Sequence, residues 1–176
     1  MRDALMETRV VSLYVHGDRP TRREDTEPTP MLAMPRVEAV EDLGLRQDRR
    51  YFRPGDPGRE RKRQVSLIDE GTIRRLEQQF GPIDRSLIKA QIVLEGDVFL
   101  PGMLGSTLRF EGGAELALTI ARRPCYAMDL IKSGLREAME EDQQGALASV
   151  TRTGTIAVGN AVRILHLAPV RDGATA

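Results

Sequence analysis

The sequence has a single cysteine and only 4% aromatic residues, and these shortages exclude several classes of protein. One cysteine cannot form an internal disulfide, so nothing in the sequence indicates an oxidising compartment. The two histidines, His16 and His166, lie far apart with no cysteine pair nearby, which argues against a zinc site. Few aromatic side chains also mean few stacking platforms for single-stranded nucleic acid.

Long apolar runs and an excess of one charge are missing as well. No stretch approaches the roughly 20 apolar residues of a membrane span, and the charged start MRDALMETRVV is unlike a signal peptide. A formal net charge of +0 gives no overall field that would attract nucleic acid. We therefore expect a cytoplasmic protein that binds neither membranes nor nucleic acid. The length of 176 residues is typical of one domain, which would span residues 1–176.

Strand-like patterns dominate the rest of the chain, because apolar residues recur with a period of two. About eight strands are expected, over residues 8–16, 37–40, 63–69, 86–96, 106–110 and 114–121, and in a final hairpin over 155–167 that turns at Gly159–Asn160. Helices are expected over 69–81, capped by Asp69, and over 132–142, capped by Ser133, while 145–150 is ambiguous. Mostly antiparallel strands with two or three inserted helices predict a mostly β fold, either a β-barrel or a folded-over sheet.

One segment is strongly basic although the whole chain is neutral. Residues 46–63 contain eight Arg or Lys and three Asp or Glu. This local excess of positive charge predicts a site for a small anionic ligand better than a nucleic-acid-binding face. The alternative is a solvated loop, because the prolines and glycines of residues 54–58 indicate a loop there. Arg49 and Arg63 adjoin expected strands and are therefore best placed to be held rigidly.

The stretch RRPCYAMD, residues 122–129, holds Cys125 directly after two arginines and a proline. Most lone cysteines in cytosolic proteins are buried and inert. A reactive cysteine must instead be a thiolate, a form that the charges of Arg122 and Arg123 would favour. Strand alternation would place Arg123 beside Cys125, and Pro124 would end the strand at the rim of the sheet. The residues alone leave open whether Cys125 is a packing residue or a working thiol.

Five stretches of the sequence, in this order, resemble the MOSC family, the domain found at the C-terminus of molybdenum-cofactor sulfurases. They are EDLGLRQDRRYF, RQVSLID, VLEGDVFLPGMLGSTLRF, RRPCYAMD with its cysteine, and TGTIAVGNAVRIL. Together they cover about residues 37–167. Each stretch is weak alone, and their common order makes the resemblance fairly specific.

The resemblance implies a β-barrel and a function around molybdenum cofactor (molybdopterin), a pterin dithiolene that carries a phosphate. Some members of the family resemble sulfur carriers, which accept persulfide sulfur on the motif cysteine from a pyridoxal-phosphate-dependent cysteine desulfurase. Others hold the cofactor and reduce N-hydroxylated compounds, with that cysteine as a metal ligand. Carried over to this sequence, the resemblance makes Cys125 the catalytic residue, as ligand or sulfur carrier. The residues that it places near the cofactor are Asp48, Arg49, Arg63, Gln64, Gln91, Arg122 and Arg123.

Two positions depart from the family pattern. Arg50 stands where the family often has His, and Ala90-Gln91 stands where it often has Arg-Asn. Gln91 keeps an amide that can donate and accept hydrogen bonds, whereas the arginine is lost. We expect the catalytic part of a molybdenum reductase, which would need a separate electron-transfer protein. The alternatives are a sulfur or cofactor carrier, and an anion-binding barrel with no molybdenum role.

Overall fold

The computed structural model describes residues 4–51, 61–141 and 143–165. Eleven strands lie in these ranges: β1 (Ala4–Val15), β2 (Leu32–Ala33), β3 (Arg36–Val40), β4 (Gly44–Leu45), β5 (Val65–Asp69), β6 (Ile92–Leu94), β7 (Thr107–Phe110), β8 (Glu115–Ala121), β9 (Ala146–Arg152), β10 (Gly154–Ala157) and β11 (Ala161–Leu165). The helices there are α1 (Glu70–Phe80), α2 (Ala127–Ile131) and α3 (Leu135–Ala138), with 3₁₀ turns η1 (Arg61–Arg63), η2 (Arg85–Leu87) and η3 (Leu100–Met103).

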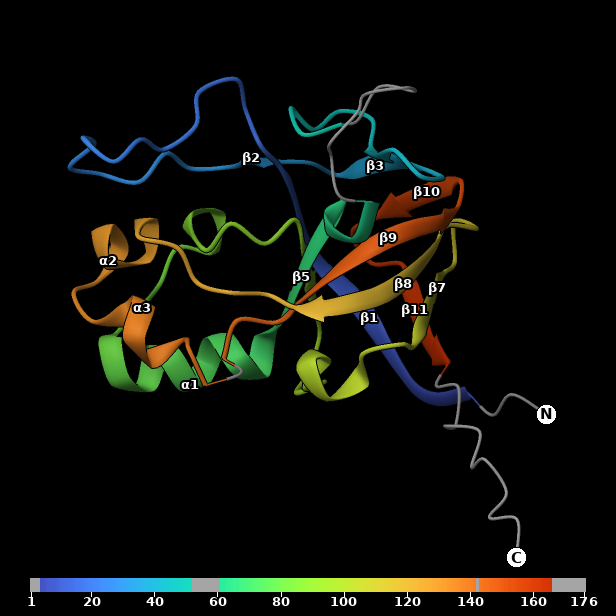
Figure 1. Ribbon diagram of the computed structural model, residues 1–176. Coiled ribbons are helices and arrows are strands. Elements are labelled where there is room, and N and C mark those ends of the chain that lie inside the picture. The colour runs from blue at the N-terminus through green and yellow to red at the C-terminus, as the bar shows by residue number, and fades with distance from the viewer. Residues whose placement is uncertain (1–3, 52–60, 142, 166–176) are drawn as a thin grey trace, which may run out of the picture.

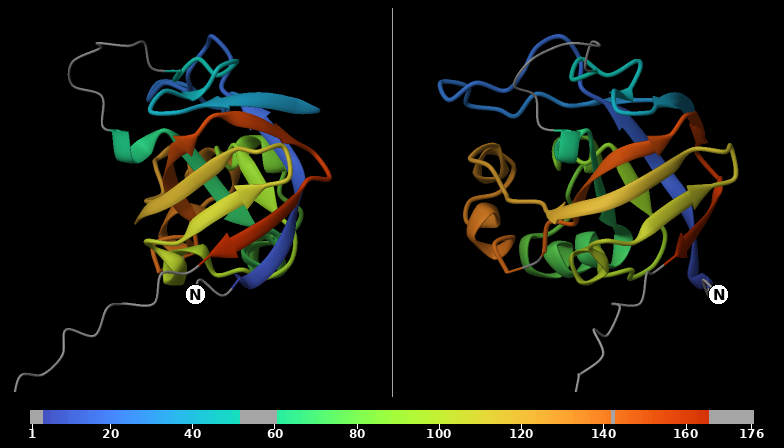
Figure 2. Two further views of the ribbon diagram at one scale, coloured as in Figure 1. Left: turned by 90° about the vertical axis from the view of Figure 1, so that its right-hand side faces the viewer. Right: turned by 45° about the vertical axis from the view of Figure 1, so that its right-hand side comes forward.

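Seven of the strands close into a barrel. Their order is β11-β7-β8-β9-β5-β6-β1, and the pairing of β1 with β11 closes the ring. All neighbours are antiparallel except β5 and β6, which run parallel. A parallel pair needs a crossover, and α1 lies in the connection between these two strands. Figure 2 shows the closed ring of strands. The prediction of a mostly β barrel with two or three helices is confirmed.

Apolar side chains from the strands fill the barrel. Leu116 and Leu118 of β8 are buried, as the period of two predicts, whereas Ile120 is only partly buried near the end of the strand. A second small sheet, β10-β3-β4, lies over the barrel. Its Val37 and Ile156 join the same apolar cluster as the barrel side chains, so the two sheets share one core.

The helices lie together on one side of the barrel (Figure 1). α1 begins as predicted, because the Asp69 carboxylate accepts a hydrogen bond of 3.0 Å from Thr72 N. Ile73 and Leu76 of α1 pack in an apolar cluster with Met128 and Leu135 of the two later helices. None of the helices in the described ranges is long and apolar enough to cross a membrane.

The predicted terminal hairpin is wrong. A turn does lie at Gly159–Asn160, but the strands on either side of it enter different sheets. β10 pairs with β3, whereas β11 pairs with β1 and β7. The cause is the closure of the barrel, because β11 is the strand that seals the ring and has both edges occupied.

Two further elements differ from the expected ones. The strand expected over 86–96 shrinks to β6, whose three residues are all buried, because η2 and a left-handed Lys89 (φ 65°) precede it. The helix expected over 132–142 begins at Leu135 after Gly134 (φ 82°), so Ser133 is not its cap. The loop expected at 54–58 lies outside the described residues.

Candidate functional site

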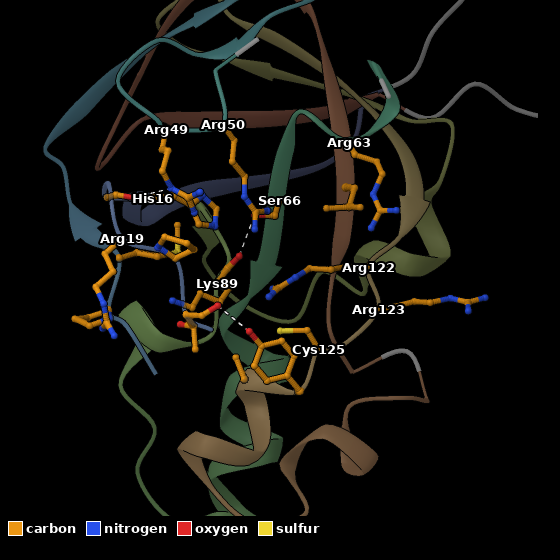
Figure 3. A pocket seen from close by; sticks show the side chains of 18 residues that line it. His16, Arg19, Arg49, Arg50, Arg63, Ser66, Lys89, Arg122, Arg123 and Cys125 are labelled. Atoms are coloured by element: carbon orange, nitrogen blue, oxygen red, sulfur yellow. Dashed lines mark hydrogen bonds between the residues drawn. The ribbon is translucent and has the colours of Figure 1, made fainter. Parts of the chain in front are cut away.

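Beside the end of β8 the protein has a pocket of about 320 Å³ that contains the thiol of Cys125 (Figure 3). Its walls come from the segments that follow β1, β4 and β8 and from those that precede β5 and β6. Seven cationic residues line it: Arg19, Arg49, Arg50, Arg63, Lys89, Arg122 and Arg123. No carboxylate of the described part of the chain lines this pocket, so its surface is strongly positive.

Arg122 is the most deeply placed of these cations, with 8% of the residue exposed. Its backbone N–H donates to Gly145 O at 3.1 Å, and its Nη2 donates to Ile88 O. Nη1 is buried and has no hydrogen-bond partner among the described residues. Burial lowers the pKa of Arg122 to about 10, although the charge of a Cys125 thiolate acts to raise it. A buried guanidinium with an unused donor is suited to an anionic ligand.

Cys125 follows β8 and stands just before α2, where its carbonyl accepts a hydrogen bond of 3.0 Å from Met128 N. The residue is exposed, so the structure agrees with an accessible thiol and not with a packing residue. Burial lowers the pKa of Lys89, and the negative charge of a Cys125 thiolate opposes that shift, so the two groups interact. Soft thiolates are metal ligands and nucleophiles, and this thiol lies among cationic side chains.

The expected pairing of Arg123 with Cys125 is wrong. β8 ends at Ala121, so strand alternation no longer decides which way residues 122–125 point. Figure 3 shows Arg122 pointing into the pocket and Arg123 pointing away from it. The charge of Cys125 acts on Arg122, which is buried, whereas Arg123 is exposed.

A buried Asp48 carboxylate supports the wall opposite Cys125. Its Oδ2 accepts hydrogen bonds from His16 N at 2.7 Å, His16 Nδ1 at 2.9 Å and Gln91 Nε2 at 2.8 Å, and its Oδ1 accepts one from Arg50 N at 2.6 Å. Burial raises the pKa of Asp48, but the hydrogen bonds and charge of His16 outweigh it, so the pKa falls below its ordinary value. Asp48 is therefore ionised and fixes several pocket groups from behind.

His16 faces the pocket with a free nitrogen. Burial lowers the pKa of His16, although its hydrogen bond to Asp48 opposes the shift, so the imidazole is neutral at pH 7. An ionised Asp48 can only accept, and Nδ1 must therefore carry the proton. This leaves Nε2 as an acceptor, which is buried and without a partner among the described residues. His16 thus offers a hydrogen-bond acceptor in a pocket of donors.

The loop after β1 forms another wall and is tied to the rest of the site. Tyr126 Oη donates to Thr21 O at 2.7 Å, and Lys89 Nζ donates to Thr29 O. Within the loop, Arg19 forms an ion pair of 2.7 Å with Asp25. Figure 3 shows Lys89 between Arg19 of this loop and Cys125, which stands just before α2. The loop is therefore held by the same elements that carry the thiol.

The predicted site residues fall into three groups. Those that line the pocket are Arg49, Arg63, Arg122, Arg123 and Cys125. Asp48 and Gln91 lie behind it, where Gln91 Oε1 accepts a hydrogen bond of 2.9 Å from Ser66 N. Gln64 is buried elsewhere, and its Oε1 accepts a hydrogen bond of 2.8 Å from Val150 N. Contact of these residues with a cofactor stays a prediction.

Sequence reasoning missed His16, Arg50 and Lys89. Arg50 attracted notice only as a departure from a family pattern, yet its guanidinium extends into the pocket although the residue as a whole is exposed (Figure 3). Desolvation there is the largest cause that lowers its pKa. The one available signal for His16 was its place at a strand end, whereas its pairing with Asp48 spans 32 residues.

Among the described residues, no group of three or more His, Cys, Asp and Glu side chains could hold a metal ion. A metal in this pocket would therefore depend on Cys125 and on ligands from a bound molecule.

Comparisons with known proteins support the fold. No protein-family model matches the chain, and no curated protein matches its sequence. The structure of the YuaD protein from Bacillus subtilis has a TM-score of 0.70 and 18% identity, over 93% of this chain and 98% of that one. YiiM from Geobacillus stearothermophilus gives 0.63 and 15%, over 94% and 77%, and YiiM from Escherichia coli gives 0.58 and 14%, over 93% and 72%. At these identities the likeness shows that this chain shares the fold of YuaD and YiiM.

Proposed function

We propose that this chain is a MOSC-domain protein whose basic pocket binds molybdenum cofactor, with Cys125 as the thiolate ligand of the metal. The observation that carries the proposal is one pocket that joins an exposed thiol to a buried, unpartnered guanidinium nitrogen of Arg122. The likeness to YuaD and YiiM and the motif resemblance around Cys125 support the same assignment.

The residues present fit the chemical parts of this cofactor. A phosphate suits arginine donors, and each charge-assisted hydrogen bond contributes about 1.5–3 kcal/mol. Arg122 Nη1 and the guanidinium of Arg50 are the donors that the pocket offers for it. His16 Nε2 would accept from an N–H group of a pterin ring. Cys125 supplies the soft sulfur ligand that suits molybdenum.

When bound, the cofactor would supply a redox-active molybdenum centre. The chain's own residues would bind its anionic parts, stabilise negative charge with the pocket cations and hold the imidazole of His16 in one tautomer through Asp48. Reduction of an N-hydroxylated compound also needs electrons, which a separate electron-transfer protein would deliver. We therefore place the chain as the substrate- and cofactor-binding part of a molybdenum reductase.

The second candidate function is a sulfur carrier, which the exposure of Cys125 favours. Its thiolate would attack the outer sulfur of a persulfide on a cysteine desulfurase. A new S–S bond forms on Cys125, the S–S bond of the donor breaks, and the donor cysteine leaves as a thiolate. Arg122 and Lys89 would stabilise the anionic persulfide, whose ionised form resembles the thiolate in charge.

Metal analysis and intact-mass spectrometry of protein from a host that makes the cofactor test both functions. We expect molybdenum and a pterin in the parent protein and their loss in Cys125→Ser. Arg74→Gln, which removes an exposed arginine of α1, is the control and should keep full loading. A mass gain of one sulfur atom without molybdenum would support the carrier instead. Full molybdenum in Cys125→Ser would contradict the assignment of the ligand.

A further inference from the structure

A second cavity, of about 720 Å³, adjoins the pocket of Cys125. The two share Arg63, Arg122 and Arg123 as a common wall, and Pro124 also borders the second cavity. Figure 3 shows Arg123 extending away from Cys125 and from the other cations of the first pocket. The second cavity is within the range of volumes that hold small molecules.

We infer that this second cavity binds a small phosphate monoester that also carries a hydroxyl or N–H donor. The inference concerns a second ligand and does not require the first pocket to hold molybdenum cofactor. Its basis is the combination of a cationic wall with a buried amide that has an unused acceptor.

The charge of the cavity favours a dianion. Arg136 from α3 joins the three shared arginines, and Glu140 is the only carboxylate among the described residues that line it. A phosphate monoester carries about −1.5 to −2 at pH 7 and offers three acceptor oxygens, so it can engage several guanidinium groups at once. A monocarboxylate would leave more of this positive charge uncompensated.

The amide of Gln144 supplies the second recognition element. The residue is 4% exposed, and its Oε1 is buried without a hydrogen-bond partner among the described residues. Leaving such an acceptor unpaired costs free energy, which a donor group of a ligand would recover. This is why a hydroxyl or N–H group belongs to the inferred ligand.

The backbone holds this amide and the cationic wall in fixed positions. Arg122 N donates to Gly145 O, directly after Gln144 in the chain. Gly145 has φ 77°, and a Cβ there would lie 2.0 Å from Leu67 O, so only glycine fits between Gln144 and β9. Because β5 sets this geometry, the backbones of Gln144 and Arg122 have little freedom to move apart.

Calorimetric titration of the full chain with adenosine 5′-monophosphate tests the inference, because this probe carries both a phosphate and N–H and hydroxyl donors. Arg136→Gln removes an exposed cation that lines only the second cavity, and binding should weaken roughly tenfold or more. Gln144→Leu should weaken the nucleotide but leave inorganic phosphate unchanged. Adenosine, which lacks the phosphate, should bind at least tenfold more weakly than the nucleotide.

Matched variants separate this site from the first pocket. Cys125→Ser and Arg50→Gln change residues that line the first pocket and not the second, so neither should alter the nucleotide binding that Arg136→Gln weakens. Arg136→Gln should keep the molybdenum content that the proposed function predicts. Parent-like binding by Arg136→Gln, or no saturable binding by the parent, would overturn the inference. So would loss of molybdenum in Arg136→Gln, because the cavity would then be part of the cofactor site, and the proposed function would stand.

Discussion

The interior of the barrel and the pocket beside it are built in opposite ways. Leu67, Leu94, Leu108 and Leu116 inside the barrel are all 0% exposed, and the closed ring of strands leaves no free edge. The pocket instead gathers seven cations and two buried nitrogen atoms that have no partner in the described part of the chain. Burying such groups costs free energy, part of which a ligand that pairs with them would recover. The barrel therefore stabilises the fold, and the pocket is kept at the expense of some of that stability.

One of the places where the two regions meet is a short backbone contact. Arg122, the deepest cation of the pocket, is hydrogen-bonded to Gly145 O, and Gly145 packs directly against β5 of the barrel. A rigid sheet thus fixes the position of a charge that would otherwise move toward solvent. Groups held in place before a ligand arrives bind it with less loss of entropy, which is the advantage of building a cationic site on a closed barrel.

The largest expected effect is on the free energy of unfolding, after a substitution in the core of the barrel. Leu118→Ala removes a side chain that is 2% exposed, and the lost burial and the remaining cavity should lower the free energy of unfolding by about 2–5 kcal/mol. Leu32→Ala, at a position that is 56% exposed, should change it by no more than about 0.5 kcal/mol. Urea unfolding followed by circular dichroism measures both. Equal losses would show that burial does not distinguish these positions.

The next largest effect is on molybdenum loading, which should differ between substitutions of the adjacent residues Arg122 and Arg123. Arg122→Met removes a buried cation with an unused donor, so molybdenum loading should fall roughly ten- to a hundredfold, while the urea midpoint stays within about 1 kcal/mol of the parent. Arg123→Met removes an exposed cation that points away from the thiol and should keep most of the loading. Metal analysis and urea unfolding test the pair. Loss of loading in Arg123→Met alone would reverse the assignment.

The barrel could be predicted from the sequence because its physics is local. Leu116 and Leu118 alternate with less buried neighbours, and Asp69 caps α1 through its own carboxylate. Each of these signals involves residues that are close in the sequence. The prediction of strand pairing was wrong for β10 and β11, because the partner of each strand depends on how the whole sheet closes into a ring.

The pocket could be predicted only in part, because it forms where strands end. Arg49, Arg122 and Cys125 were predicted from charge and motif, and all three line it. Once the chain leaves a strand, side-chain direction no longer follows a period of two. The prediction that Arg123 lies beside Cys125 was therefore wrong, and its side chain points away from the thiol. The contact between His16 and Asp48 joins segments that share no sequence pattern, and no local signal could reveal it.

A smaller effect should appear in the reactivity of the thiol, which belongs to the pocket and not to the core. Because Cys125 is exposed beside Arg50, Lys89 and Arg122, iodoacetamide should alkylate it in the folded protein. Arg50→Gln removes one cation beside the thiol, so it should slow alkylation by the anion iodoacetate several-fold but alkylation by neutral iodoacetamide much less, and high salt should affect the parent in the same way. Arg74→Gln is the surface control. A thiol that reacts only after unfolding would place Cys125 in the core instead.

The smallest expected effect is a pH dependence of stability that originates at His16. Burial lowers the pKa of His16 below its ordinary value of 6.5, so the unfolded chain takes up this proton first as the pH falls. The contribution of His16 to stability is therefore fully present above pH 6.5 and declines below it, until the folded imidazole is also protonated. Arg50 and Lys89 face this imidazole and oppose its protonation, whereas Asp48 favours it. His16→Asn keeps an amide N–H that can donate to Asp48 but does not titrate, so the decline in the window directly below pH 6.5 should be smaller than in the parent. Urea unfolding at several pH values compares the two proteins, and the titration of Asp48, whose pKa is lowered from 3.8, falls below this window. An unchanged pH dependence in His16→Asn would mean that another group, such as His166, causes it.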